Sequence, residues 1–131
     1  MSLVVKNLIV DHGAIRAISG VSFTVETGKL SAVIGANGAG KSTLLRTLSG
    51  LNKATEGSAH WGEHNLLSGK PESHVRNGVS HVSEGKSVVA ELTVEENLGL
   101  GALWRRNKKE ATETKQQVIE LFPRLGERLG Q

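Results

Sequence analysis

Residues 35–42 of this 131-residue chain read GANGAGKS and match the pattern G-x-x-x-x-G-K-[ST] at every fixed position. Glycines let the backbone curve closely enough for several N–H groups to point at phosphate oxygens. In this pattern Lys41 is expected to reach the β- and γ-phosphates of a nucleotide, and the Ser42 hydroxyl is expected to bind Mg²⁺. The residues predicted to hold the phosphates are Gly35, Asn37, Gly38, Ala39, Gly40, Lys41, Ser42 and Thr43.

The segments on either side of this loop favour the same function. Residues 30–34 (LSAVI) form a short apolar run that predicts a buried strand ending at Gly35. After the loop, Gly50 is placed to end a helix, since glycine is common just beyond helix C-termini. The leucines expected on one face of that helix are Leu44, Leu45, Leu48 and Leu51. The order strand, glycine loop, helix places a phosphate on a helix N-terminus.

Composition excludes several classes of protein. A chain of 131 residues has room for one domain, and with 3% aromatic residues its core must be mainly aliphatic. The absence of cysteine excludes disulfides and cysteine-based catalysis or metal binding, and suits a reducing compartment. Residues 1–6 lack the pattern of a signal peptide, and no apolar run approaches the ~20 residues of a membrane span. A net charge of +3 is too small to indicate nucleic-acid binding by itself.

The remaining elements follow from hydrophobic spacing and from capping residues. Thr93 followed by Glu96 predicts a capping box at the start of a helix. A turn is expected at 26–29, and Pro123 is expected to interrupt the last helix. Strands are predicted at residues 3–10, 21–25, 57–62 and 79–82, and helices at 71–76 and 108–122.

Three stretches resemble the ATP-binding subunits of ABC transporters: the loop at 35–42, Gly50-Leu51 and Glu56-Gly57. Two further stretches make the chain similar to the ATP-binding subunit of branched-chain amino-acid importers. They are VSEGK at 82–86 followed by ELTVEENL at 91–98, and LFPRL at 121–125. The related urea importers more often carry Gln at the position of Glu84, so a urea or other solute importer stays open.

The resemblance implies an α/β P-loop NTPase fold of the ABC ATPase type, with an N-terminal antiparallel β portion and the start of a helical subdomain. The expected domain is residues 1–131, as the N-terminal part of one ABC ATP-binding domain. The family's signature motif, Walker B strand and switch histidine are not found in this sequence. The resemblance therefore implies an ATPase subunit in the full-length protein and an inactive, incomplete domain in this fragment.

The same resemblance implies ATP and Mg²⁺ as cofactors, and membrane permease subunits and a second ATP-binding subunit as partners, with no nucleic acid. The expected location is cytoplasmic, peripheral at the inner face of the plasma membrane. Glu84 stands where the family's metal- and permease-sensing glutamine sits, which implies a role at the nucleotide and Mg²⁺.

Several positions depart from the family pattern. His12 occupies the place of an aromatic residue that stacks on adenine, and two interpretations stay open: base stacking and a solvated turn. Lys86 replaces an arginine, which keeps the charge but not the planar fork. Ser83 and Val89 replace the more common Pro and Phe.

The histidines after residue 12 and the basic residues at 105–109 are not expected to form binding sites. The spacing of His60, His64, His74 and His81 matches no metal-ligand pattern. The basic residues at 105–109 are expected to form a solvated loop rather than a nucleic-acid or lipid surface. Two other functional classes remain: a non-transport ABC ATPase acting on nucleic acid, and a non-catalytic nucleotide-binding fragment.

Overall fold

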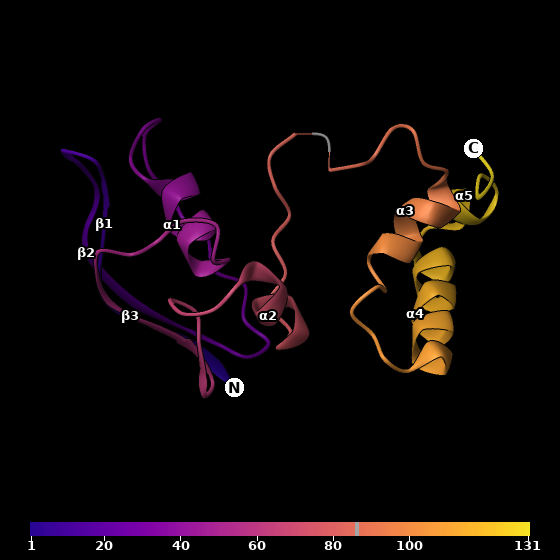
Figure 1. Ribbon diagram of the computed structural model, residues 1–131, viewed down its shortest axis with the longest axis horizontal. Coiled ribbons are helices and arrows are strands. Elements are labelled where there is room, and N and C mark those ends of the chain that lie inside the picture. The colour runs from indigo at the N-terminus through magenta and orange to yellow at the C-terminus, as the bar shows by residue number, and fades with distance from the viewer. Residues whose placement is uncertain (86) are drawn as a thin grey trace. The chain divides into compact units, whose positions relative to one another are not determined.

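The computed structural model describes residues 1–85 and 87–131. Lys86, which the sequence singled out as a substituted arginine, lies outside the described residues. The chain divides into two compact units, Met1–His81 and Val82–Gln131, and each is described by itself (Figure 1). None of the described helices combines the length and the apolar character needed to cross a bilayer.

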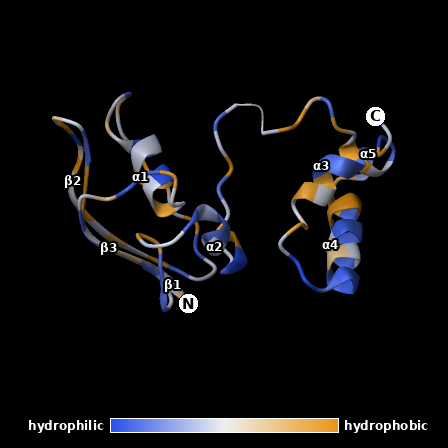
Figure 2. Cartoon of the chain, viewed as in Figure 1, coloured by the Kyte–Doolittle hydropathy of each residue, from blue (hydrophilic) through white to orange (hydrophobic). Residues whose placement is uncertain are grey.

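The first unit contains an antiparallel sheet with the strand order β2-β1-β3-β4. Figure 2 shows both hydrophobic and hydrophilic residues along β1 and β2. In residues 21–25 of β2 the two kinds alternate, as expected of a strand with one buried face. Its strands are β1 (Ser2–His12), β2 (Ile15–Glu26), β3 (Glu56–Trp61) and β4 (His64–Asn65). The strands predicted at 3–10, 21–25 and 57–62 are therefore confirmed, and so is the turn at 26–29, where Lys29 N donates to Glu26 O at 3.2 Å.

Helix α1 (Lys41–Leu48) packs on the sheet through two of the four leucines expected on one face. Leu44 and Leu48 are 6% and 7% exposed, whereas Leu45 and Leu51 are 46% and 49% exposed. The helix ends as predicted, because Ser49 is the C-cap and Gly50 takes the left-handed φ of 76°. The buried aliphatic core of this unit consists of Val5, Leu8, Val10, Ile18, Leu44, Leu48, Ala59 and Leu66.

Residues 30–34 do not form the buried strand that their apolar character predicts. Residues 31–36 have no regular secondary structure, Leu30 is 100% exposed and Ile34 is 91% exposed. The physical reason is pairing: a strand needs a neighbour for its N–H and C=O groups, and the described sheet places none beside this segment. The strand predicted at 79–82 is wrong for the same reason, since these residues pair with no strand of the described sheet.

The short helix α2 (Pro71–Arg76) begins with proline in its first turn, as predicted. Its His74 is 1% exposed and packs against the end of α1, where a Cβ built on Gly50 would lie 2.7 Å from His74 Nε2. His74 Nδ1 lies 2.8 Å from His64 Nε2. Burial lowers the pKa of His74, and the neighbouring His64 lowers it further.

The second unit is helical, with α3 (Val94–Leu100), α4 (Lys108–Leu121) and α5 (Pro123–Gly126). The predicted capping box is present: Glu96 N donates to Thr93 Oγ1 at 3.2 Å, and Thr93 N donates to Glu96 Oε2 at 2.8 Å. The bonds that Glu96 Oε2 accepts from Thr93 N and, at 3.0 Å, from Thr93 Oγ1 hold the pKa of Glu96 below its usual value. The helix predicted at 108–122 is confirmed over Lys108–Leu121, and α5 begins at Pro123.

Candidate nucleotide-binding site

The phosphate loop connects the exposed segment 30–34 to α1. Residues 35–36 lack regular secondary structure, and a turn follows in which Ala39 N donates to Ala36 O at 3.1 Å. Gly38 and Gly40 take left-handed φ values of 81° and 91°. Residues with a side chain rarely adopt this conformation, so the loop depends on glycine at both positions.

Gly40 is needed for a second reason, which is its packing against β2. A Cβ at Gly40 would lie 2.5 Å from the carbonyl oxygen of Ala17 and 3.4 Å from Ile18 Cγ1. A Cβ at Gly38 would meet nothing within 4 Å. The loop therefore rests on β2 at Gly40 and is open at Gly38.

The N-terminus of α1 provides donors for an anion. Gly40 is its N-cap and carries no side chain, and no side-chain hydrogen bond caps the helix. The first α-helical bond of this turn runs from Leu44 N to Gly40 O at 2.8 Å. The backbone N–H groups of residues 41–43 lack partners within the helix and carry the positive end of its dipole. This arrangement suits a phosphate group.

Lys41 lies across the loop. Its Nζ donates to the carbonyl oxygens of Gly35 at 2.6 Å and of Ala36 at 2.7 Å. The ammonium group is therefore held at the first two residues of the loop by two acceptors that phosphate oxygens can replace. A charge-assisted bond to phosphate is the stronger alternative, because both partners are then ionised.

The glycine cradle, the helix N-terminus and Lys41 together fit a nucleotide's phosphates. Ser42 is the second residue of α1 and is exposed, so its hydroxyl is accessible to a metal ion. Within residues 1–85 and 87–131, no group of three or more His, Cys, Asp or Glu side chains is placed to hold a metal. A Mg²⁺ at Ser42 therefore fits only as an ion that takes most of its ligands from water and phosphate, which is its usual habit beside nucleotides.

The structure places His12 in the same unit as the phosphate loop, at the end of β1. It is exposed and pairs with Ile15 across a hairpin turn in which Gly13 has a φ of 60°. This exposed position is compatible with both interpretations of His12, base stacking and a solvated turn.

Glu84 lies in the second unit, in an exposed bend next to Gly85, whose φ is 94°. Since each unit is described by itself, the structure does not bring Glu84 to the phosphate loop. Its expected role at Mg²⁺ stays a prediction.

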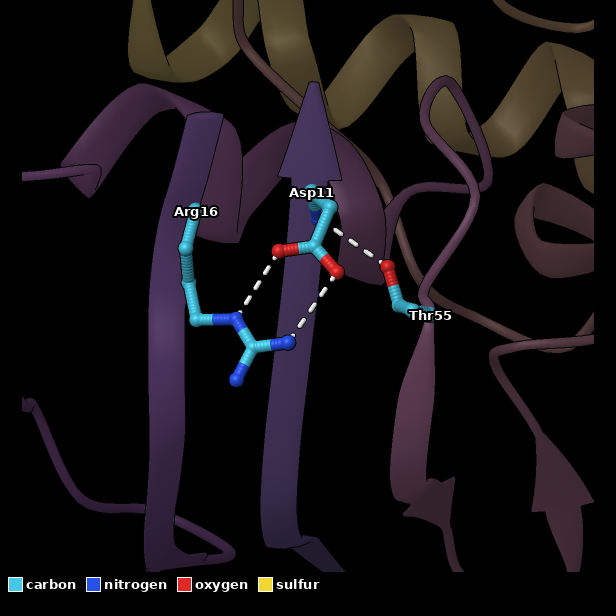
Figure 3. Close-up of polar contacts among 3 residues, drawn as sticks. All are labelled: Asp11, Arg16 and Thr55. Carbon is cyan, nitrogen blue, oxygen red and sulfur yellow. Dashed lines mark hydrogen bonds and ion pairs between the residues drawn. The ribbon is translucent and has the colours of Figure 1, made fainter. Parts of the chain in front are cut away.

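Sequence reasoning missed an ion pair beside His12. Asp11 on β1 pairs directly with Arg16 on β2, and Arg16 Nε donates to Asp11 Oδ1 at 2.9 Å (Figure 3). The hydrogen bond from Arg16 is the main cause that holds the pKa of Asp11 below its usual value. The available signal was an acidic and a basic residue on either side of a glycine turn, a pattern typical of cross-strand pairs.

Comparison with known proteins identifies the family. The profile of the family described as ABC transporter matches residues 18–129. The high-affinity branched-chain amino acid transport ATP-binding protein BraG of Pseudomonas aeruginosa is 45% identical over 92% of this chain and 51% of its own length. The arabinose import ATP-binding protein AraG of Vibrio parahaemolyticus is 37% identical over 86% of this chain and 22% of its own length.

Solved structures agree with the sequence relatives. A structure described as the ATP-binding subunit of an ABC transporter superposes with a TM-score of 0.85 and 32% identity, over 98% of this chain and 53% of that protein. A nucleotide-free ATP-binding cassette superposes with a TM-score of 0.78 and 25% identity, over 98% of this chain and 56% of that protein. The chain thus spans about half the length of BraG and of these cassettes. It belongs to the ABC transporter family and has the P-loop NTPase fold of that family's ATP-binding domain.

Proposed function

We propose that this chain binds ATP together with Mg²⁺ and serves an ABC importer that takes up branched-chain amino acids through membrane permease subunits. The observation that carries nucleotide binding is the phosphate loop itself, with Gly40 seated on Ala17 and Lys41 Nζ held over the loop. The solute class is supported by the 45% identity to BraG, a protein named for branched-chain amino acid transport.

In this proposal the phosphates accept hydrogen bonds from the backbone N–H groups of residues 37–43. Lys41 exchanges the carbonyl oxygens of Gly35 and Ala36 for phosphate oxygens and offsets their negative charge. The backbone donors remain fixed by the helix and the glycine turns. Positioning and charge stabilisation are the main contributions a protein makes to phosphoryl transfer, and this loop supplies both.

Ser42 and Glu84 are the proposed protein ligands of Mg²⁺. A Mg²⁺ held there would supply positive charge that offsets part of the charge of the phosphates. An exposed hydroxyl and an exposed carboxylate both offer the oxygen ligands that Mg²⁺ prefers. His12 is the proposed platform for the adenine base, because its exposed imidazole ring is free to stack.

The proposed partners are the permease subunits and a second ATP-binding subunit, at the inner face of the plasma membrane.

Two alternatives remain for the solute. One is a sugar, because AraG is named for arabinose import. The other is urea, because the urea importers differ from this chain at the position of Glu84 only in more often carrying Gln there. The alternative to an importer subunit is a non-transport ABC ATPase that acts on nucleic acid. Recovery of the chain with nucleic acid in place of membrane permeases would favour that class.

Nucleotide binding is tested by calorimetry with ATP and AMP on the parent chain and on Lys41→Ala. Charged hydrogen bonds contribute enough that we expect ATP affinity to fall about ten- to a hundredfold, with a much smaller change for AMP, which lacks the β- and γ-phosphates. Lys53→Ala is the matched control, because Lys53 is an exposed lysine remote in sequence from the loop. Equal losses for ATP and AMP would overturn the assignment.

We also expect the 131-residue chain to bind ATP without turning it over. The sequence contains neither a signature motif nor a Walker B carboxylate, so a general base for the attacking water is missing. A phosphate-release assay checks this expectation, and Lys41-dependent turnover at an ordinary enzymatic rate would contradict it.

A further inference from the structure

The tip of the β1–β2 hairpin is held by a bidentate ion pair. Arg16 Nε donates to Asp11 Oδ1 at 2.9 Å, and Arg16 Nη2 donates to Asp11 Oδ2 at 3.3 Å (Figure 3). The pair is next in sequence to His12 and spans the two strands that meet at the turn. A bidentate pair fixes the orientation of both side chains, which a single contact does not.

Asp11 is also tied to the segment that leads into β3. Its backbone N–H donates to Thr55 Oγ1 at 3.0 Å (Figure 3). In turn, Thr55 N donates to Ile9 O at 2.8 Å. The strand that carries His12 is thus anchored on both sides, by Arg16 on β2 and by Thr55 immediately before β3.

The ion pair lies beside an irregularity that supports the phosphate loop. Val10 pairs with Ile18, but the next residue, Asp11, pairs with Arg16, so Ala17 is an extra residue on β2. Ala17 is also the residue whose carbonyl oxygen lies against Gly40. Bulges of this kind are common beside functional sites, where they redirect the chain.

We propose that Asp11 and Arg16 are positioning residues that fix the hairpin register at this bulge, so that His12 and the phosphate loop bind the base and the phosphates of one nucleotide together. The inference rests on the proposed ATP binding at His12 and Lys41. Its physical basis is register: a slip of β1 by one residue along β2 would turn His12 to the opposite face of the sheet, whereas Gly40 would keep its contact with Ala17 on β2.

The test reverses the charges of the pair in the 131-residue chain. Asp11→Arg and Arg16→Asp are compared with the double variant, which restores an ion pair with its ends exchanged. Binding of ATP and of inorganic triphosphate is measured by calorimetry, and circular dichroism and thermal unfolding report on the fold. Glu113→Arg is the matched control, because it reverses an exposed residue whose Oε1 lies 3.9 Å from Lys109 Nζ in the second unit.

We expect each single reversal to weaken ATP binding about fivefold, while binding of triphosphate, which has no base, changes less than about twofold. The double variant should recover most of the ATP affinity. In a His12→Ala background, the reversals should cause no further loss, because the group they position is gone.

Equal losses for ATP and triphosphate, or no loss in the single variants, would overturn the positioning role while leaving the proposed ATP binding intact. Additive losses in the His12→Ala background would overturn it as well. A parent chain that binds neither ligand in a Lys41-dependent manner would instead refute the proposed function, and the inference with it.

Discussion

The carbonyl oxygen of Ala17 lies so close to Gly40 that a Cβ on this glycine would lie 2.5 Å from the oxygen. This contact joins the antiparallel sheet to the phosphate loop. It is made by the extra residue of a bulged strand and by a glycine that also has a φ of 91°. The position of the loop therefore depends on backbone packing as well as on the conformation of its glycines.

Substitution of the two left-handed loop glycines separates these effects. Gly38→Ala faces only conformational strain, so we expect it to destabilise the chain by about 1–2 kcal/mol. Gly40→Ala adds a steric clash with Ala17, and we expect a loss greater than about 3 kcal/mol together with loss of ATP binding. Urea unfolding and calorimetry measure both quantities. Similar losses of stability for the two variants would show that the contact with Ala17 is unimportant.

The role of His12 is tested with one smaller and one larger side chain. His12→Ala should weaken ATP binding by about 1 kcal/mol, by analogy with base–aromatic stacks in nucleic-acid complexes. His12→Tyr should match or exceed the parent, because the phenol ring offers a larger face. Fluorescence or calorimetric titration measures the affinities, with inorganic triphosphate as the ligand that should bind all three proteins alike. If both variants bind ATP as the parent does, His12 is a turn residue.

The buried His74 predicts a dependence of stability on pH. Its pKa is lowered in the folded chain by burial and by His64, so the unfolded chain binds the proton more readily. Stability is therefore full above the unfolded pKa of about 6.5 and falls as the pH decreases from there toward the folded pKa. Urea unfolding at about pH 7.5 and about pH 5.5 measures the loss.

In the same experiment His74→Met should show a weaker loss on acidification, since its neutral side chain does not titrate. His60→Gln is the control and should keep the parental dependence on pH. A His74→Met variant as sensitive to acid as the parent would assign the effect to other groups.

The exposed segment at 30–34 predicts self-association. Leu30 and Ile34 are 100% and 91% exposed and belong to a segment whose backbone pairs with no strand of the described sheet. Exposed apolar side chains on unpaired backbone favour association between chains. We expect concentration-dependent oligomers in sedimentation experiments, reduced by Leu30→Ser combined with Ile34→Ser.

Leu103→Ser is the control for that experiment, because Leu103 is 78% exposed in the other unit. A parent chain that stays monomeric with a sharp unfolding transition at high temperature would contradict the prediction. So would a reduction of self-association by Leu103→Ser equal to that of the double variant.

The sequence alone determined the local features of this protein. The end of α1 at Gly50, the first turn of α2 and the capping box of Thr93 and Glu96 all follow the predictions. Each of these features depends on residues a few positions apart, whose backbone preferences and hydrogen bonds act within one turn. The family resemblance also came from such short motifs and is confirmed by the match over residues 18–129.

The tertiary structure decided what depends on pairing between distant segments. Residues 30–34 have the apolar character of a strand but no partner in the described sheet, so composition by itself did not make them one. The bulge at Ala17, its contact with Gly40 and the pair of Asp11 with Arg16 depend on the register of two strands. Register is a relation between chain segments brought together by folding, and hydrophobic periodicity along a single strand does not specify a one-residue bulge.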